Sequence, residues 1–144
     1  MRPVMDVDEL NEFLVEVFPQ LDPEGTTQRS LTVTRIAPGE ADVRFLADAR
    51  HIRPGGTVSG PALFTLADVT GYALVLAHIG REALAVTTNL NINFMLKADP
   101  GPVEGFGRLL KLGRQLAVFE VAMVAEGRTV AHATGTYAIP PKKG

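Results

Sequence analysis

The sequence predicts an α+β fold in which one antiparallel sheet of about six strands wraps around one long buried helix. The run from Gly60 to Ile79 is apolar nearly all round, as expected of a helix enclosed in a core. From residue 85 onward the chain forms strand-length apolar or alternating runs separated by glycine and proline. No repeat or linker interrupts the 144 residues, so a single domain over 1–144 is expected, with its core at about 30–139.

Composition excludes several classes of protein. Hydrophobic residues make up 46% and charged residues 21% of the chain, as in soluble globular domains. A net charge of −2, no Trp and few aromatic residues argue against a nucleic-acid binder. Without cysteine there is no disulfide, thiolate metal site or cysteine nucleophile. The first residues show no apolar signal segment, so a cytoplasmic location is expected.

The first third of the chain predicts a helix and a hairpin. Residues 6–18 carry an apolar stripe, and Asp6 with Glu9 has the spacing of a capping box. A polar loop at 25–30 follows. Residues 30–36 and 41–47 then alternate around a Pro-Gly-Glu turn, which indicates a hairpin.

The long central helix has clear end signals. Ser59 suits its N-cap, Pro61 its first turn and Gly80 its end. Asp68 is the only formally charged residue between positions 55 and 79. Because a carboxylate at the centre of a membrane span costs about 2.5–3.5 kcal/mol on insertion scales, a buried helix is favoured and no membrane partner is expected.

Four further strands are predicted at 85–96, 103–112, 115–125 and 129–139. The run at 115–125 is apolar on both faces, which indicates a central strand covered on both sides. One helix cannot cover both faces of six strands. We therefore expect a partner subunit and a homo-oligomer.

Three segments carry a family resemblance: PGGTVSGPALFTLAD at 54–68, VTTNLNINFM at 86–95 and GRTVAHATGT at 127–136. They resemble hotdog-fold acyl-CoA thioesterases of the PaaI-like type, in the 4-hydroxybenzoyl-CoA thioesterase superfamily. In that family a His-Gly-Gly turn opens the central helix, and an Asp follows eight residues after the first Gly. Here Ser59-Gly60-Pro61 stands in place of the turn, Asp68 matches, and Arg53 replaces the usual Asn or Gln.

The resemblance implies a hotdog fold and hydrolysis of an acyl-CoA thioester by a dimer or a dimer of dimers. CoA is then part of the substrate, and neither a separate cofactor nor a metal is required. The sequence itself contains no phosphate-binding loop, dinucleotide motif or cluster of metal ligands.

Asp68 and Gly60 are the main catalytic candidates. A carboxylate inside an apolar run is costly unless partnered, which indicates a general base or nucleophile, or an Asp bonded to a nearby Ser or Thr. A free N–H at a helix N-terminus suits a thioester carbonyl oxygen. Since eight helical residues span about 12 Å, one chain cannot bring both groups to one carbonyl. A two-fold dimer would set Gly60 of one subunit against Asp68 of the other.

The resemblance suggests further site residues. Thr87 matches a Ser or Thr that holds the attacking water in the family. Strict alternation puts Thr87 on the Asn89 face, so this role needs a bulge or an edge position. Thr88 is the alternative. Tyr72 either lines the pocket or packs in the core, with packing favoured. Arg53 contacts the carbonyl region or a phosphate. The remaining substrate or CoA candidates are Ser59, Pro61, Lys97, Arg108, Lys111 and Arg114, the basic ones being otherwise a solvated strand-turn surface.

Two other functions stay open at this stage. A hotdog dehydratase or hydratase would need a histidine, such as His51, paired with Asp68. A non-catalytic acyl-binding protein would have Asp68 bonded to Arg53 and out of reach of a ligand.

Overall fold

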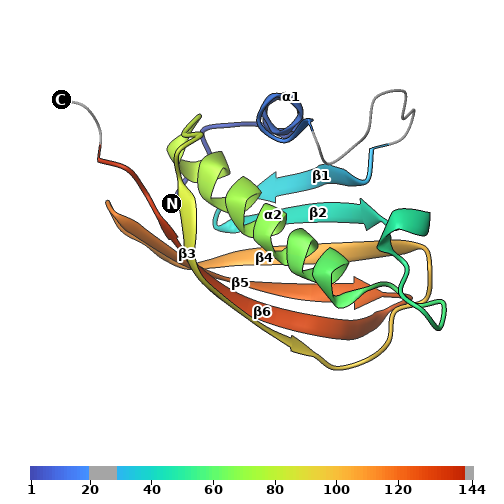
Figure 1. Cartoon of the computed structure of the whole chain (residues 1–144). Helices are drawn as coiled ribbons and strands as arrows, with labels where there is room; N and C mark the ends of the chain where they lie inside the picture. Colours follow the sequence, from blue (N-terminus) through green and yellow to red (C-terminus); the bar gives the residue numbers. More distant parts are fainter. Residues whose placement is uncertain (20–28, 142–144) are drawn as a thin grey trace.

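The computed structural model describes residues 1–19 and 29–141, and two helices lie on one face of a six-stranded antiparallel sheet (Figure 1). The elements are α1 Val7–Val17, β1 Leu31–Ala37, β2 Glu40–Leu46, the short 3-10 helix η2 Ala49–His51, α2 Gly60–Ile79, β3 Val86–Phe94, β4 Pro102–Leu112, β5 Leu116–Ala125 and β6 Arg128–Ala138. The strand order is β1-β2-β4-β5-β6-β3. The predicted fold class and order of elements are confirmed. Most of the predicted loop at 25–30 lies outside the described residues.

The long helix α2 is the core of the fold, as predicted. It is long and apolar enough to cross a membrane, but 78% of its most apolar window is buried inside the fold. Glycines let it approach the sheet closely: a Cβ at Gly105 would lie 2.6 Å from Thr70 Oγ1, and a Cβ at Gly71 would lie 2.3 Å from the Phe119 ring. The helix therefore sits lower on the sheet than larger side chains at these positions would allow.

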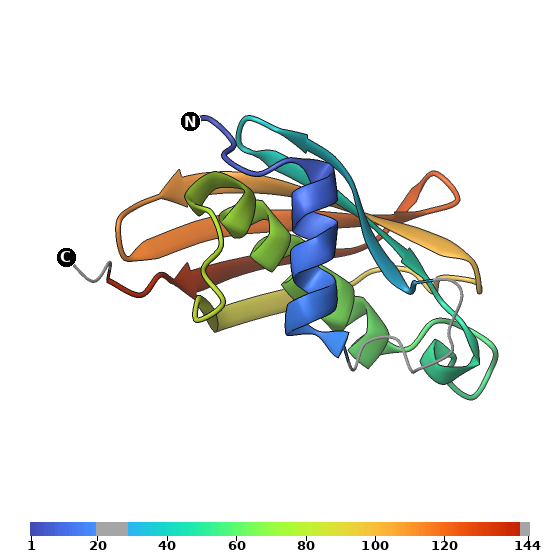
Figure 2. The same ribbon diagram turned by 90° about the horizontal axis from the view of Figure 1, so that it is seen from above.

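The helix α1 closes one edge of the sheet. Its capping box is present, with the Glu9 N–H donating to Asp6 Oδ1 at 2.8 Å. Seen from above, α1 lies across α2 (Figure 2). From this helix the Asn11 side chain donates to Val33 O at 3.0 Å and accepts from Val33 N at 2.8 Å, as a neighbouring strand would. The opposite edge, β3, pairs with β6 on one side only.

One expectation about strand faces was wrong, and a second, the cover on the outer face of β5 by a partner subunit, stays a prediction. The alternation predicted for β1 fails because a bulge between Val33 and Arg35 shifts the register, so that Arg35 is exposed and bonds Glu40 at 2.7 Å while Ile36 packs against the core. The central position of β5 is confirmed. Within this chain, however, only one of its faces is buried, because both helices lie on the same side of the sheet.

Candidate active site

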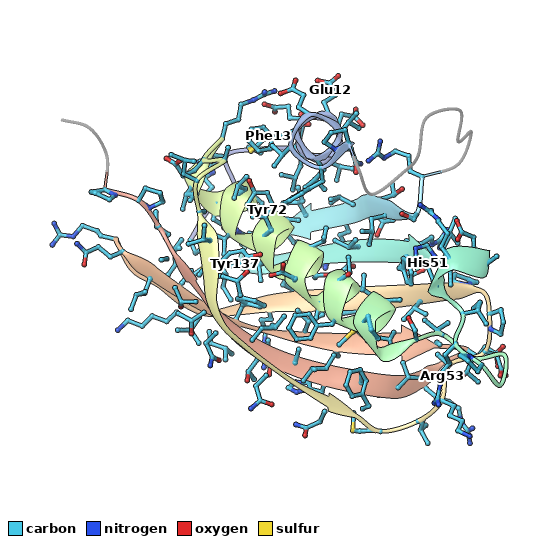
Figure 3. The ribbon with its side chains drawn as sticks, in the orientation of Figure 1. Glu12, Phe13, His51, Arg53, Tyr72 and Tyr137 are labelled. Carbon is cyan, nitrogen blue, oxygen red and sulfur yellow. The ribbon has the colours of Figure 1, made fainter. Side chains whose placement is uncertain are left out.

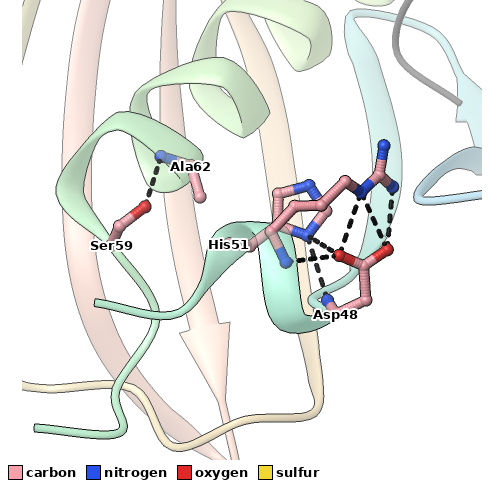
Figure 4. Close-up of polar contacts among 5 residues, drawn as sticks. Asp48, His51, Ser59 and Ala62 are labelled. Carbon is pink, nitrogen blue, oxygen red and sulfur yellow. Dashed lines mark hydrogen bonds and ion pairs between the residues drawn. The ribbon is translucent and has the colours of Figure 1, made fainter. Parts of the chain in front are cut away.

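The segment before α2 is fixed by η2 (Figure 4). Asp48 caps η2, and hydrogen bonds from Arg50 hold the pKa of its carboxyl at about 2, so it stays charged. The main-chain oxygen of His51 in turn accepts a hydrogen bond from Ser59 N at 2.7 Å. The start of α2 is thus anchored by backbone contacts rather than by a flexible connection.

Gly60 has the one free amide of the first turn of α2 within the described part of the chain. Ser59 acts as the N-cap, as predicted, since Ala62 N donates to its Oγ at 3.2 Å. Leu63 N donates to Ser59 O, and Pro61 has no N–H. An N–H left over at a helix N-terminus attracts a negative or polarised oxygen, because the helix dipole adds to its own positive charge. The Gly60 N–H can therefore donate a hydrogen bond to a ligand oxygen.

A hollow of about 390 Å³ lies beside Gly60. Its walls include apolar side chains, among them Leu63 and Phe94, and two basic residues, Arg53 and Lys97. We call it the Gly60 hollow. Arg53 is exposed here and stands in a tight turn, where its N–H donates to Thr57 O at 2.8 Å.

Asp68 is half-buried on α2 and its side chain has two partners among the described residues. The hydroxyl of Thr87 donates to Asp68 Oδ1 at 2.5 Å, and the hydroxyl of Tyr137 lies 2.8 Å from the same oxygen. The Tyr137 hydroxyl is also 2.8 Å from the main-chain oxygen of Asp68. Asp68 Oδ2 is left without a protein partner in this part of the chain.

Thr87 reaches Asp68 because of the β-bulge that the sequence analysis had to assume. The β3–β6 register shifts between Thr87 and Asn89, so Thr87 shares the partly buried side of β3 with Leu90. Thr88 is exposed and donates to Thr136 O at 3.2 Å, away from Asp68. Of the two candidates, Thr87 is thus the one beside the carboxylate. Its proton is used on Asp68, so a water could only donate to its Oγ.

Tyr137 is the residue that sequence reasoning missed. It lies at the end of β6, is only 2% exposed and packs against Phe119 and Tyr72, and Figure 3 shows the two tyrosines close together beside α2. The signal was a tyrosine on the face of β6 that otherwise carries small residues, since a buried phenol needs a hydrogen-bond partner. Burial raises the pKa of the Tyr137 phenol and the neighbouring Asp68 carboxylate raises it further, so the hydroxyl keeps its proton.

The other predicted residues are not gathered into one site by this chain. Tyr72 is 4% exposed and packs in the core against Phe18 and Tyr137, as favoured. Pro61 is exposed at the helix start.

The basic candidates are also dispersed. Arg108 bonds Glu120 at 2.5 Å on the sheet face away from the helices. Arg114 lines a different hollow, beside His78 at the other end of α2. Lys111 is exposed near the end of β4, and Lys97 borders the Gly60 hollow together with Arg53.

The histidines do not approach Asp68. His51 belongs to the turn before α2, and its Nδ1 accepts from Asp48 N at 3.0 Å. His78 is buried, accepting from Gly39 N on Nε2 at 2.8 Å while Nδ1 bonds Leu74 O at 2.8 Å. Because a backbone N–H can only donate, the Nε2 that faces Gly39 N is an acceptor, and both ring nitrogens of His78 contact the main chain at the end of α2 away from Gly60.

Gly60, Phe64 and Asp68 follow one another at four-residue spacing and are incompletely buried, as are Pro61 and Thr65 beside them, whereas α2 is buried from Val69 to His78. We call these three residues the open face of α2. It runs along β3, from Thr87 beside Asp68 to Phe94, whose ring is 3.5 Å from where a Gly60 Cβ would stand. The two ends of this face are separated by about 12 Å of helix.

This arrangement, a curved antiparallel sheet around one central helix, is a hotdog fold. A family model described as the thioesterase superfamily matches residues 55–132, and the chain belongs to this family. A solved structure from Silicibacter sp. TM1040, provisionally named a thioesterase, is 51% identical, with 98% of this chain and 96% of that chain covered and a TM-score of 0.85.

Two further relatives are similar over most of their length. A variant of the phenylacetic acid degradation protein PaaI from Thermus thermophilus is 28% identical, with 87% of this chain and 99% of that chain covered and a TM-score of 0.71. A Pseudomonas aeruginosa protein provisionally named an esterase is 35% identical over 100 residues, which are 68% of this chain and 74% of that protein. The family resemblance predicted from the sequence is confirmed, and the chain is placed among thioester hydrolases.

Proposed function

We propose that this protein hydrolyses acyl-CoA thioesters as a homodimer whose two sites are each shared between subunits. The observation that carries the proposal is the open face of α2. It has a free amide at Gly60 and a tethered carboxylate at Asp68, about 12 Å apart and therefore unable to act on one carbonyl within one chain.

The free edge of β3 supports the dimer. Asn11 occupies the β1 edge, whereas β3 has no partner on its outer side within the described residues. Large apolar side chains are exposed along this region, including Val86 at 55% and Phe94 at 54%. An open edge with exposed apolar side chains favours pairing with another strand. Two β3 strands paired antiparallel about a two-fold axis would turn Gly60 of one subunit toward Asp68 of the other.

In the proposed reaction the thioester carbonyl oxygen accepts a hydrogen bond from the Gly60 N–H, at the positive end of the α2 dipole. The partner's Asp68 takes a proton from a water, whose oxygen attacks the carbonyl carbon. The tetrahedral intermediate then collapses, the C–S bond breaks, and the CoA thiolate leaves as the acid is released. Direct attack by Asp68, followed by hydrolysis of the resulting anhydride, reaches the same products.

The charges around the Gly60 hollow support a CoA ester as the substrate class. Arg53 and Lys97 border the hollow beside Leu63 and Phe94. Basic side chains next to apolar walls suit a ligand with phosphates on an otherwise flexible, largely uncharged arm.

The two alternatives find less support. A dehydratase would pair a histidine with Asp68, and none does so in residues 1–19 and 29–141. A non-catalytic binder would have Asp68 tied to Arg53, and no such bond is present in the described chain.

The test is a panel of acyl-CoAs of different chain length, charge and aromaticity, with release of the free thiol as the readout. Turnover of at least one ester by the wild type, and its loss in Asp68→Asn, is the expected result. Including 2-enoyl-CoA substrates and following hydration in the same samples tests the lyase alternative. Binding of acyl-CoA with no thiol release from any ester would instead favour the acyl-binding protein.

A further inference from the structure

We propose that Tyr137 is a positioning residue that holds one oxygen of Asp68 and so leaves the other as the reacting oxygen. This inference rests on the catalytic role of Asp68 in the proposed function. Tyr137 belongs to β6 and is distant in sequence from α2, which carries Asp68.

The geometry selects a single carboxylate oxygen. Thr87 and Tyr137 both bond Oδ1, at 2.5 and 2.8 Å, and come from two different strands. Oδ2 receives no bond from the described residues. A carboxylate fixed through one oxygen by two donors loses its side-chain rotation, and only Oδ2 remains to take a proton from water or to attack a carbonyl carbon.

Tyr137 also ties the carboxylate to the helix that carries it. Its hydroxyl lies 2.8 Å from the main-chain oxygen of Asp68 as well as from Oδ1, so one phenol contacts both ends of the same residue. The ring is fixed in turn, since it is 2% exposed and lies 5.6 Å from Phe119 and 5.9 Å from Tyr72 between ring centres. The core thereby sets the position of the donor.

The phenol of Tyr137 remains a donor at neutral pH. Burial and the adjacent carboxylate both raise the pKa of Tyr137 above its ordinary value of about 10. The other titratable groups around this cluster are Tyr72 on α2 and, acting on Tyr72, Glu82 after the helix. No basic side chain in the described residues bonds Asp68. Both hydrogen-bond donors to Asp68 in this part of the chain are therefore neutral hydroxyls.

The test compares Tyr137→Phe with Tyr72→Phe. Each variant removes one buried phenol hydroxyl from the same aromatic cluster and keeps the ring, but the Tyr72 hydroxyl bonds Ala83 O at 3.4 Å instead of Asp68. In Tyr137→Phe we expect kcat to fall about 10- to 100-fold with KM nearly unchanged, and the acidic limb of the pH–rate profile to move up because the carboxylate loses one hydrogen-bond donor. In Tyr72→Phe the acidic limb stays in place.

A second measurement does not depend on turnover. The carboxyl ¹³C signals are followed against pH in both variants and in the wild type, with Asp68 assigned by its disappearance in Asp68→Asn. An upward move of the Asp68 midpoint in Tyr137→Phe alone supports the positioning role, even if the acyl-CoA panel shows no turnover and the proposed function fails. Equal midpoints in all three proteins, with both variants folded by thermal unfolding, would overturn the inference.

Discussion

At the scale of single residues, the hydrogen bonds that Asp68 accepts could also be accepted by an asparagine side chain. Thr87 and Tyr137 donate to Oδ1, and the amide oxygen of asparagine can accept both bonds. Asp68→Asn therefore removes the charge and the base while keeping the contacts. We expect kcat to fall by about 10²–10⁴-fold, with little change in the unfolding temperature. Activity within about tenfold of the wild type would exclude Asp68 as base or nucleophile.

Gly60 can be tested by removing only its N–H. Gly60→Pro deletes the donor at a first-turn position that proline tolerates, and we expect a loss of about 10²–10³-fold in kcat.

Gly60→Ala is the matched control, since it keeps the N–H. An added Cβ would be 3.5 Å from the Phe94 ring, an ordinary contact, and alanine also reports the cost of a side chain before Pro61. If both variants lose activity equally, a steric effect and not the amide is responsible.

Arg53 belongs to the Gly60 hollow and not to the Asp68 cluster. Since it is exposed, its contact with a charged ligand is screened by water, and Arg53→Asn should raise KM about two- to fivefold with kcat unchanged. Steady-state kinetics on the best ester of the panel decide this. A fall in kcat at constant KM would indicate a contact with the reacting carbonyl instead. Pro54→Ala, in the same turn, is a control for the effect of the turn itself.

The residues of the candidate site differ in how well the sequence predicted them. Gly60 and Asp68 could be identified because Ser59 and Pro61 mark the start of the helix, Asp68 is the one charge in an apolar run, and the family resemblance points to both positions. Tyr137 could not, because its partner is 69 positions away and only the β3–β6–helix packing brings the two together.

At the scale of elements, helix ends and the β1–β2 hairpin could be predicted from the sequence, but the register shifts within strands could not. The caps of α1 and α2 act within one helical turn, so Asp6 and Ser59 were placed correctly. The bulge in β1 was not foreseen, and the bulge at Thr87 was assumed only because the resemblance required that side chain to face inward. A bulge depends on the register with a neighbouring strand, which one sequence does not display.

A prediction at the scale of elements concerns the stability that Asn11 gives to the contact between α1 and β1. Its side chain forms two hydrogen bonds with the main chain of Val33, and Asn11→Leu leaves both groups without that partner. We expect a loss of about 1–3 kcal/mol in the free energy of unfolding, measured by urea titration. Glu12→Leu, an exposed change on the same helix (Figure 3), is the control and should have a much smaller effect. Equal stability of the two variants would show that the β1 edge does not need Asn11.

At the scale of the whole molecule, α1 closes the β1 edge of the sheet, the β3 edge has no partner within the described residues, and each end of the open face of α2 carries half of the proposed site. The apolar outer face of β5 was predicted to need a cover, and within one chain it is only half-buried. A subunit that pairs through β3 does not require that face, so the β3 edge alone is sufficient to complete the proposed site.

A mixing experiment tests the shared site directly. Asp68→Asn keeps a working Gly60, and Gly60→Pro keeps a working Asp68, so a heterodimer of the two has one site with both groups intact if the groups come from different subunits. With equal amounts and random exchange, half of the dimers are mixed and half of their sites are intact, so about one quarter of wild-type activity should return.

The same experiment separates the two geometries. If Gly60 and Asp68 of one chain acted together, neither chain of the heterodimer would carry a complete pair and nothing would return. Differently tagged subunits, mixed under mild denaturation and refolded, allow the heterodimer to be isolated and its formation to be verified by native mass spectrometry. A mixture of Gly60→Ala with Asp68→Asn, taken through the same procedure, reports how much activity survives subunit exchange and refolding. Absence of recovery in a verified heterodimer of Gly60→Pro and Asp68→Asn would therefore exclude the cross-subunit site. It would not bear on whether the wild type hydrolyses the ester.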